Sequence, residues 1–175
     1  CGACAIGINI ETRPDISLKA LLQGVAVRPA PSASIRVSGL TADSRQVAPG
    51  YAFFAVAGTR DDGSRYVDAA RKAGATAIIG PPGRRAASRT ASFYSTYDVR
   101  AALSRAAARF YGDPSLAMGV VGVTGTNGKT TITYLVEAAL RAARKNPGVI
   151  GTINERCGAS AIPAKNTTPE SAHLQ

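Results

Sequence analysis

Residues 124–131 read TGTNGKTT, and this stretch decides how the rest of the chain is interpreted. It follows an apolar run, MGVVGVT at 118–124, which is typical of a parallel strand covered on both faces. It precedes a segment with helical apolar spacing that extends from about residue 128 to residue 145. A glycine-rich loop of this kind indicates phosphate binding when it lies between a strand and a helix, and the sequence predicts that context here.

The residue types in this loop suit the binding of a phosphate chain. Gly125 and Gly128 allow the backbone to bend so that successive N–H groups converge, and the amino end of the helix adds partial positive charge. Lys129 supplies a mobile charge for the outer phosphates, and the hydroxyl of Thr130 can ligate Mg²⁺. The candidate nucleotide-binding residues are therefore Gly125, Thr126, Asn127, Gly128, Lys129, Thr130 and Thr131.

The loop departs from the general G-x-x-x-x-G-K-T pattern. That pattern needs a glycine at position 123, where this chain has valine, and the glycines stand instead at 122, 125 and 128. A glycine-rich turn that merely opens a helix would account for the glycines. It would not account for Lys129-Thr130-Thr131 at the start of the helix, so we favour a phosphate site.

The composition of the 175 residues favours a folded α/β protein and excludes several classes. The apolar fraction of 45% and the charged fraction of 18% exclude a largely disordered chain. No apolar run approaches the roughly 18 residues that a membrane-spanning helix needs, so no membrane partner is expected. The net charge of +10 comes from scattered arginines, without a basic stripe and its stacking aromatics. We therefore expect a small polyanionic ligand and no nucleic acid.

The three cysteines are an odd number and give no disulfide framework. Cys1 and Cys4 have C-x-x-C spacing, but the remaining candidate ligands, Cys157 and His173, match no compact zinc module. A reducing compartment fits this cysteine usage best, which predicts a cytoplasmic protein.

Periodicity and turn residues predict alternating strands and helices. The expected helices are residues 16–25, 64–74, 98–112 and 128–145, and the expected strands are residues 35–43, 51–58, 75–80, 92–96, 118–124 and 148–152. The last helix should bury Ile132, Leu135, Val136, Ala139, Leu140 and Ala143. A change in composition at 81–97 predicts a boundary. The expected fold is a small N-terminal α/β domain followed by the first part of a P-loop parallel-sheet domain.

Three sequence motifs together resemble the Mur ligase family. GTNGKTT at 125–131 is similar to the ATP loop of the Mur ligases and of their folylpolyglutamate synthetase relatives. DSRQVAPGYAFFAVAGTRDDGSRY at 43–66 resembles the substrate-nucleotide domain of the Mur enzymes that add the third and later peptide residues. NTTPES at 166–171 resembles the muropeptide loop of the type that adds the third residue. The resemblance covers about residues 16–175.

The resemblance implies a division of the chain and roles for individual residues. Residues 15–97 would be the UDP-MurNAc-binding domain, and residues 98–175 an incomplete ATP-binding domain. The diphosphate end of that substrate would contact Ala42, Ser44, Thr59, Arg60 and Asp61, although TRDDGS departs from the more common His-containing versions. The peptide end would contact Asn166, Thr167 and Thr168. Lys129 and Thr130 would act in catalysis, and Thr130 would also ligate the metal.

The chemistry that the resemblance implies is ATP-driven amide formation with Mg²⁺, in the synthesis of peptidoglycan precursors. A carboxylate of UDP-MurNAc-L-Ala-D-Glu attacks the γ-phosphorus of ATP. The amino group of meso-diaminopimelate or L-lysine then displaces phosphate from the acyl phosphate. The family's further metal carboxylate, its carbamylated lysine and its amino-acid-binding domain would lie beyond residue 175. We therefore expect the chain alone to be inactive and the full-length enzyme to be a monomer.

Two other functions remain open at this level. One is another amide ligase of the same superfamily, of the folylpolyglutamate or cyanophycin type, although the pattern at 43–66 argues against it. The other is a basic P-loop module that binds nucleic acid or a partner protein and uses ATP as a switch. Structural roles also remain open for Asp43 and Arg45, as a surface ion pair, and for Asp62-Gly63, as a turn.

Overall fold

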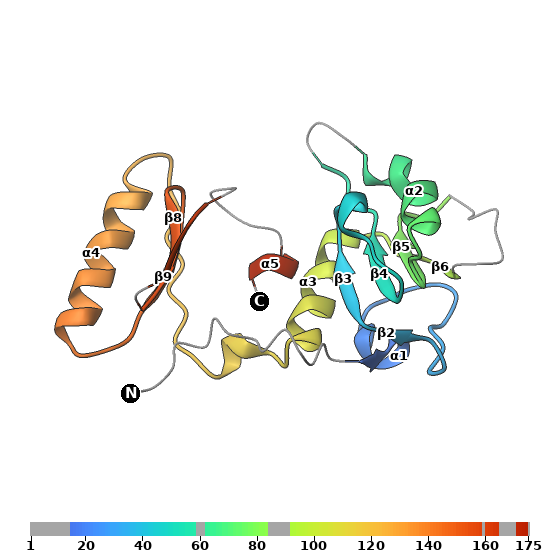
Figure 1. The fold of residues 1–175 in the computed structure, drawn as a ribbon, viewed down its shortest axis with the longest axis horizontal. Coiled ribbons are helices and arrows are strands. Elements are labelled where there is room, and N and C mark those ends of the chain that lie inside the picture. The colour runs from blue at the N-terminus through green and yellow to red at the C-terminus, as the bar shows by residue number, and fades with distance from the viewer. Residues whose placement is uncertain (1–14, 59–61, 84–91, 159, 165–170, 175) are drawn as a thin grey trace. The chain divides into compact units, whose positions relative to one another are not determined.

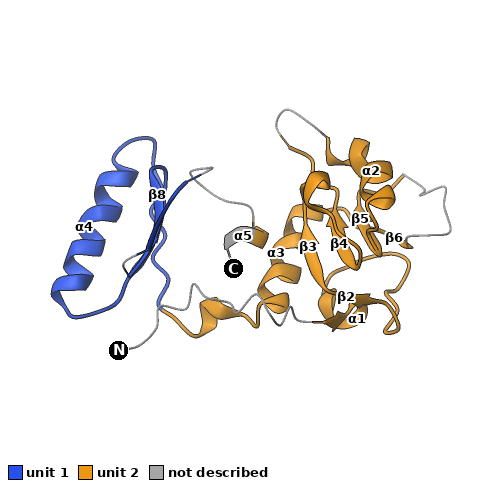
Figure 2. Ribbon diagram, viewed as in Figure 1, with its two compact units in different colours: residues 1–11, 119–169 blue, residues 12–118, 170–175 orange. Residues whose placement is uncertain are grey.

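The structure of the protein is a computed structural model that describes residues 15–58, 62–83, 92–158, 160–164 and 171–174. The chain divides into two compact units, coloured separately in Figure 2. Unit 1 comprises residues 1–11 and 119–169, and unit 2 comprises residues 12–118 and 170–175. In the described part of the chain, no helix is long and apolar enough to cross a lipid bilayer.

Unit 2 is built on a four-stranded parallel sheet with the order β3-β4-β5-β6 (Figure 1). Its strands are β3 (Gly39–Thr41), β4 (Tyr51–Phe54), β5 (Ala77–Gly80) and β6 (Ser92–Ser95). A separate antiparallel pair joins β1 (Ile16–Ser17) to β2 (Arg36–Val37). The parallel sheet confirms the predicted α/β class, and β4, β5 and β6 lie inside the stretches predicted as strands.

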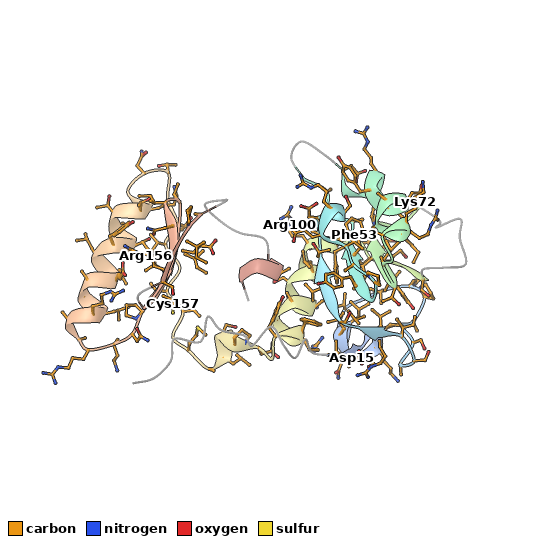
Figure 3. All side chains as sticks on the ribbon, viewed as in Figure 1. Asp15, Phe53, Lys72, Arg100, Arg156 and Cys157 are labelled. Atoms are coloured by element: carbon orange, nitrogen blue, oxygen red, sulfur yellow. The ribbon has the colours of Figure 1, made fainter. Side chains whose placement is uncertain are left out.

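Alternate residues of the central strands β4 and β5 enter two different apolar clusters. Phe53 and Ile78 pack with Val67 of α2 (Val67–Lys72). Phe54 and Ile79 pack in a second cluster with residues of α1 (Leu18–Leu21) and α3 (Val99–Phe110). Because successive side chains of a strand point to opposite faces, the sheet is covered on both sides and its central strands are apolar throughout. Figure 3 shows Phe53 within this core.

Helix α3 belongs to the core of unit 2. Its side chains of Ala102, Leu103, Ala106 and Phe110 are buried, as the helical spacing predicted. Asp98 caps the helix, since its side chain accepts a hydrogen bond from the backbone N–H of Ala101 at 2.8 Å. Unit 2 thus extends past the boundary expected after residue 97 and continues to residue 118.

Short elements complete unit 2. They are the 3₁₀ turns η1 (Ser44–Gln46), η2 (Gly63–Tyr66) and η3 (Pro114–Leu116), and the helix α5 (Ser171–Leu174). Helix α5 packs on α3, where Ala172 contacts the apolar cluster.

Unit 1 contains one long helix, α4 (Lys129–Ala142), and a three-stranded antiparallel sheet. The strands β7 (Gly148–Ile150), β8 (Asn154–Cys157) and β9 (Ser160–Pro163) pair in that order. The strand predicted at 118–124 is not formed in these described residues, and Val120 and Val121 are exposed. A strand needs a neighbour for its backbone hydrogen bonds, and β7, which was expected to lie in the same parallel sheet, pairs instead with β8.

The predicted buried face of α4 is also wrong. Ile132 is 47% exposed and Leu135 is 64% exposed. Within α4, all of which the structure describes, the one buried side chain is that of Glu137. The sheet contacts the helix through Tyr134 and Glu137, so Ile132 and Leu135 face solvent, and Val136 and Leu140 are only half-buried.

The cysteine count did not predict the state of Cys157. The structure places this residue, at the end of β8, in a disulfide bond.

Candidate functional site

Two glycines of the loop before α4, residues 124–128, have positive φ angles. Gly125 has φ +150° and Gly128 has φ +76°, and residues that carry a Cβ rarely adopt such backbone conformations. Gly128 precedes the first residue of α4 and has no side chain to cap the helix. The first N–H groups of a helix have no partner within the helix, so this end attracts anions. The loop is exposed, which leaves that amino end open to a ligand.

Lys129 lies over the loop. Its Nζ donates to the carbonyl oxygen of Gly125 at 2.6 Å and, more weakly, to that of Thr126 at 3.4 Å. These two contacts hold the ammonium group beside the convergent backbone. A phosphate oxygen can replace the carbonyl oxygens as the acceptor, because it carries a negative charge that attracts the ammonium group and a carbonyl oxygen does not.

A cavity of about 290 Å³ adjoins the loop. The cavity is lined by the phosphate loop and the first turns of α4, and by β7 with the turn that follows it. The lining residues are Val123, Thr124, Gly125, Lys129, Thr130, Thr133, Tyr134, Val149, Ile150, Gly151, Thr152, Ile153 and Asn154. Hydroxyl, amide and ammonium groups therefore surround a space of the size of a small polar ligand.

The cavity brings together some predicted residues and adds others. Lys129 and Thr130 line it, whereas Thr126, Asn127 and Thr131 do not. Sequence analysis missed Thr133, Tyr134, Thr152 and Asn154. Helical spacing could have indicated the first two, because residues three and four positions after Thr130 share its side of the helix.

Thr130 is the candidate metal ligand among the described residues. Thr130 lines the cavity with Lys129, and no group of three or more His, Cys, Asp or Glu side chains that could hold a metal occurs in the described ranges. Mg²⁺ commonly takes few protein ligands and completes its shell with phosphate oxygens and water. A single hydroxyl next to a phosphate loop fits such an ion.

A second candidate site lies after β3 in unit 2. Asp43 caps η1: the backbone N–H of Arg45 donates to its Oδ1 at 3.0 Å, and the guanidinium Nε and Nη2 donate to its carboxylate at 2.9 and 2.8 Å. The hydrogen bonds from the Arg45 side chain hold the pKa of the Asp43 carboxyl below its ordinary value of 3.8. This arrangement orients the half-buried Ser44 and the neighbouring Ala42, which packs on the core.

The segment after the adjacent strand β4 is held in a similar way. An isolated bridge joins Ala57 to Asp62, and the Asp62 side chain accepts from the backbone N–H of Ser64 at 2.9 Å. Gly63 lies so close to Val56 that a Cβ on Gly63 would be 2.5 Å from the Val56 carbonyl oxygen. The ion pair of Asp43 and the turn at Asp62-Gly63 are thus both present as structural features.

The carboxyl ends of β3 and β4 are neighbours in a parallel sheet, and ligands of open α/β sheets bind at that edge. Ala42 and Ser44 follow β3 there. The other predicted substrate residues, Thr59, Arg60, Asp61, Asn166, Thr167 and Thr168, lie outside the described residues.

Two family models match the chain. One, described as "Mur ligase family, catalytic domain", matches residues 36–111, and the other, "Mur ligase middle domain", matches residues 123–175.

Curated proteins named UDP-N-acetylmuramoyl-L-alanyl-D-glutamate--2,6-diaminopimelate ligase are similar to most of the chain. The one from Geobacter metallireducens is 48% identical over 145 residues, which are 82% of this chain and 28% of that protein. Those from Streptomyces coelicolor and Aquifex aeolicus are 41% and 40% identical, over 83% and 81% of this chain and 29% and 31% of their own lengths. The chain thus spans less than a third of the length of these relatives.

Solved structures share the fold. A UDP-N-acetylmuramoyl-L-alanyl-D-glutamate--2,6-diaminopimelate ligase aligns with TM-score 0.65 and 23% identity, over 92% of this chain and 32% of that one. A UDP-N-acetylmuramoylalanyl-D-glutamyl-2,6-diaminopimelate--D-alanyl-D-alanyl ligase from Acinetobacter baumannii aligns with TM-score 0.57 and 22% identity, over 81% of this chain and 31% of that one.

Proposed function

The chain belongs to the Mur ligase family, and on that premise we propose that it forms part of an ATP-dependent ligase that adds the third amino acid to UDP-MurNAc-L-Ala-D-Glu. The observation that carries the proposal is the exposed loop at the amino end of α4, where Lys129 and Thr130 line a cavity. The names of the curated relatives favour 2,6-diaminopimelate over L-lysine as the third amino acid. The site of this reaction would be cytoplasmic, where nucleotide-linked precursors and ATP are available.

The residues of unit 1 would bind the phosphate chain of ATP. The backbone N–H groups of Gly125–Thr131 and the helix end would hold its oxygens, and Lys129 would move from the carbonyl oxygens of the loop to the outer phosphates. Thr130 would hold Mg²⁺, which would supply charge neutralisation at the phosphates. In phosphoryl transfer the protein contributes mainly position and charge, and this is what Lys129 and the loop provide.

The residues of unit 2 would bind the uridine diphosphate end of the second substrate. Ser44 presents a hydroxyl group at the carboxyl edge of the sheet, on a turn that Asp43 and Arg45 hold in place. Ala42 would contribute backbone groups beside it, and Thr59, Arg60 and Asp61 would complete this pocket. Asn166, Thr167 and Thr168 would contact the peptide end, whose carboxylate is the group that ATP activates.

Binding measurements on the 175-residue chain test this proposal. Isothermal titration calorimetry should detect binding of both Mg·ATP and UDP-MurNAc-L-Ala-D-Glu to the chain. Lys129→Ala should abolish ATP binding, and Lys145→Ala, an exposed lysine beyond the other end of α4, should leave it unchanged. Ser44→Ala should weaken binding of the UDP-sugar, and the exposed Ser92→Ala should not.

Other outcomes would favour the alternatives. Binding of ATP without any affinity for the UDP-sugar would indicate a different amide ligase of the superfamily. Salt-dependent binding to DNA or RNA, again without affinity for the UDP-sugar, would indicate a nucleotide-switched module.

A further inference from the structure

A buried acidic side chain joins α4 to the sheet of unit 1. The Glu137 side chain is only 8% exposed. Its Oε1 accepts from Nε and Nη2 of Arg141 on the same helix, at 3.2 and 3.0 Å. Its Oε2 accepts from Nη2 of Arg156, which lies on β8, 19 residues further along the chain. One carboxylate thus holds an arginine from a different element against the helix.

Arg156 makes a second contact with α4. Its guanidinium carbon lies 4.2 Å from the centre of the Tyr134 ring, within the range of a cation–π interaction. Among the described residues, its buried Nε has no hydrogen-bond partner. The position of the guanidinium plane is therefore set by two groups, the carboxylate of Glu137 and the ring of Tyr134. A buried N–H without a partner costs free energy. Hydrogen bonding of Nε therefore does not determine where this arginine side chain lies.

The Tyr134 side chain, which Arg156 contacts, also lines the cavity beside the loop at 124–128. Tyr134 lines that cavity together with Lys129 and Thr130, which are five and four residues earlier on the same helix. A tyrosine ring on an exposed helix is free to change its χ1 rotamer unless a neighbour holds it. Arg156 is such a neighbour, and Glu137 holds Arg156.

We propose that Arg156 is a positioning residue that holds Tyr134 as a wall of the nucleotide cavity, with buried Glu137 as the anchor. This inference rests on the proposed function, because it takes the ligand of the cavity to be a nucleoside triphosphate. Arg141 provides the matched comparison: it binds the same carboxylate, lies seven residues after Tyr134 on the same helix, and has a side chain that is 47% exposed.

A single tryptophan tests the position of the wall. The chain contains no Trp, so Tyr134→Trp introduces one fluorophore into the lining of the cavity and keeps an aromatic face for Arg156. Addition of Mg·ATP should change the emission of this variant. In the same background, Arg156→Met should shift the emission of the free protein towards that of solvent-exposed Trp, and Arg141→Met should not.

Calorimetry on chains that keep Tyr134 tests the effect on binding. Arg156→Met should weaken Mg·ATP binding about three- to tenfold, the range expected when a partly buried cation–π contact is lost. Arg156→Lys keeps a cation over the ring and should restore much of that affinity, while Arg141→Met should change it less than twofold. Melting curves for all variants show whether each one is folded.

Each outcome bears on the proposal. Equal effects of Arg156→Met and Arg141→Met on ATP affinity would overturn the role of Arg156, because the common factor would then be the stability of α4. If the emission of Tyr134→Trp did not change when ATP binds, the role of Tyr134 would be overturned, while the proposed binding of ATP at the loop would stand. If the unmodified chain bound no ATP in calorimetry, the proposed function and this inference would both fail.

Discussion

Replacement of Asp43 should loosen the turn that presents Ser44. The side chain caps η1 and accepts hydrogen bonds from the backbone and the side chain of Arg45. Loss of such a cap typically costs about 1 kcal/mol, within a range of roughly 0.5–2. The ion pair adds little, because the Arg45 side chain is 87% exposed and solvent screens the interaction. Asp43→Ala should therefore cost about 1 kcal/mol, and Asp43→Asn, which keeps the capping oxygen, should cost less than half of that.

The pH dependence gives a second measurement of the same contact. Since Arg45 lowers the pKa of Asp43 in the folded chain, the stabilisation is complete above the ordinary value of 3.8 and is lost as the pH falls through the lower folded-state value. The difference in stability between wild type and Asp43→Asn should thus be largest at neutral pH and disappear in acid.

Urea unfolding of the chain, followed by circular dichroism between pH 7 and pH 2.5, measures both effects. Asp68→Ala, which removes an exposed carboxylate from its helical pair with Arg71, is the matched control and should change stability by less than about 0.5 kcal/mol. Calorimetry should show weaker binding of the UDP-sugar to Asp43→Ala than to Asp68→Ala. The reasoning is refuted if Asp43→Asn destabilises as much as Asp43→Ala, or if the difference from wild type persists in acid.

Three further predictions concern packing, backbone approach and the phosphate loop. Leu103→Ala should destabilise unit 2 by about 2–5 kcal/mol, because this side chain of α3 is fully buried. Leu135→Ala, on the exposed face of α4, should change the free energy of unfolding by less than about 0.5 kcal/mol. Equal costs of the two substitutions in urea unfolding would contradict the assignment of α3 to the core. Gly63→Ala should lower the melting temperature, since its Cβ would be 2.5 Å from the backbone oxygen of Val56, while Gly83→Ala has open space and should show only the strain of its positive φ. Lys129→Ala should remove ATP binding in calorimetry without lowering the melting temperature, because its Nζ contacts only exposed loop carbonyls, and a large loss of stability would count against a binding role.

Several features of the chain could be predicted from local sequence. The strands β4, β5 and β6 are short apolar runs between turn residues, and α3 combines a capping aspartate with a helical apolar stripe. Each of these signals comes from residues close in sequence, and in the folded chain the apolar residues of these elements lie in the core. The start of α4 at Lys129, directly after a glycine turn, is likewise a local feature, whereas the phosphate-binding role of that turn stays a prediction.

The sequence therefore determined the α/β class and the family. Only the tertiary structure decided which strands pair in unit 1 and which side of α4 is buried. Apolar periodicity marks the stripe of Ile132 and Leu135 as suited to burial, but burial requires a neighbour, and the sheet contacts the side that carries Glu137 instead. The partner of that carboxylate, Arg156, lies on another element, and no local pattern connects two residues whose contact depends on how a helix and a strand pack.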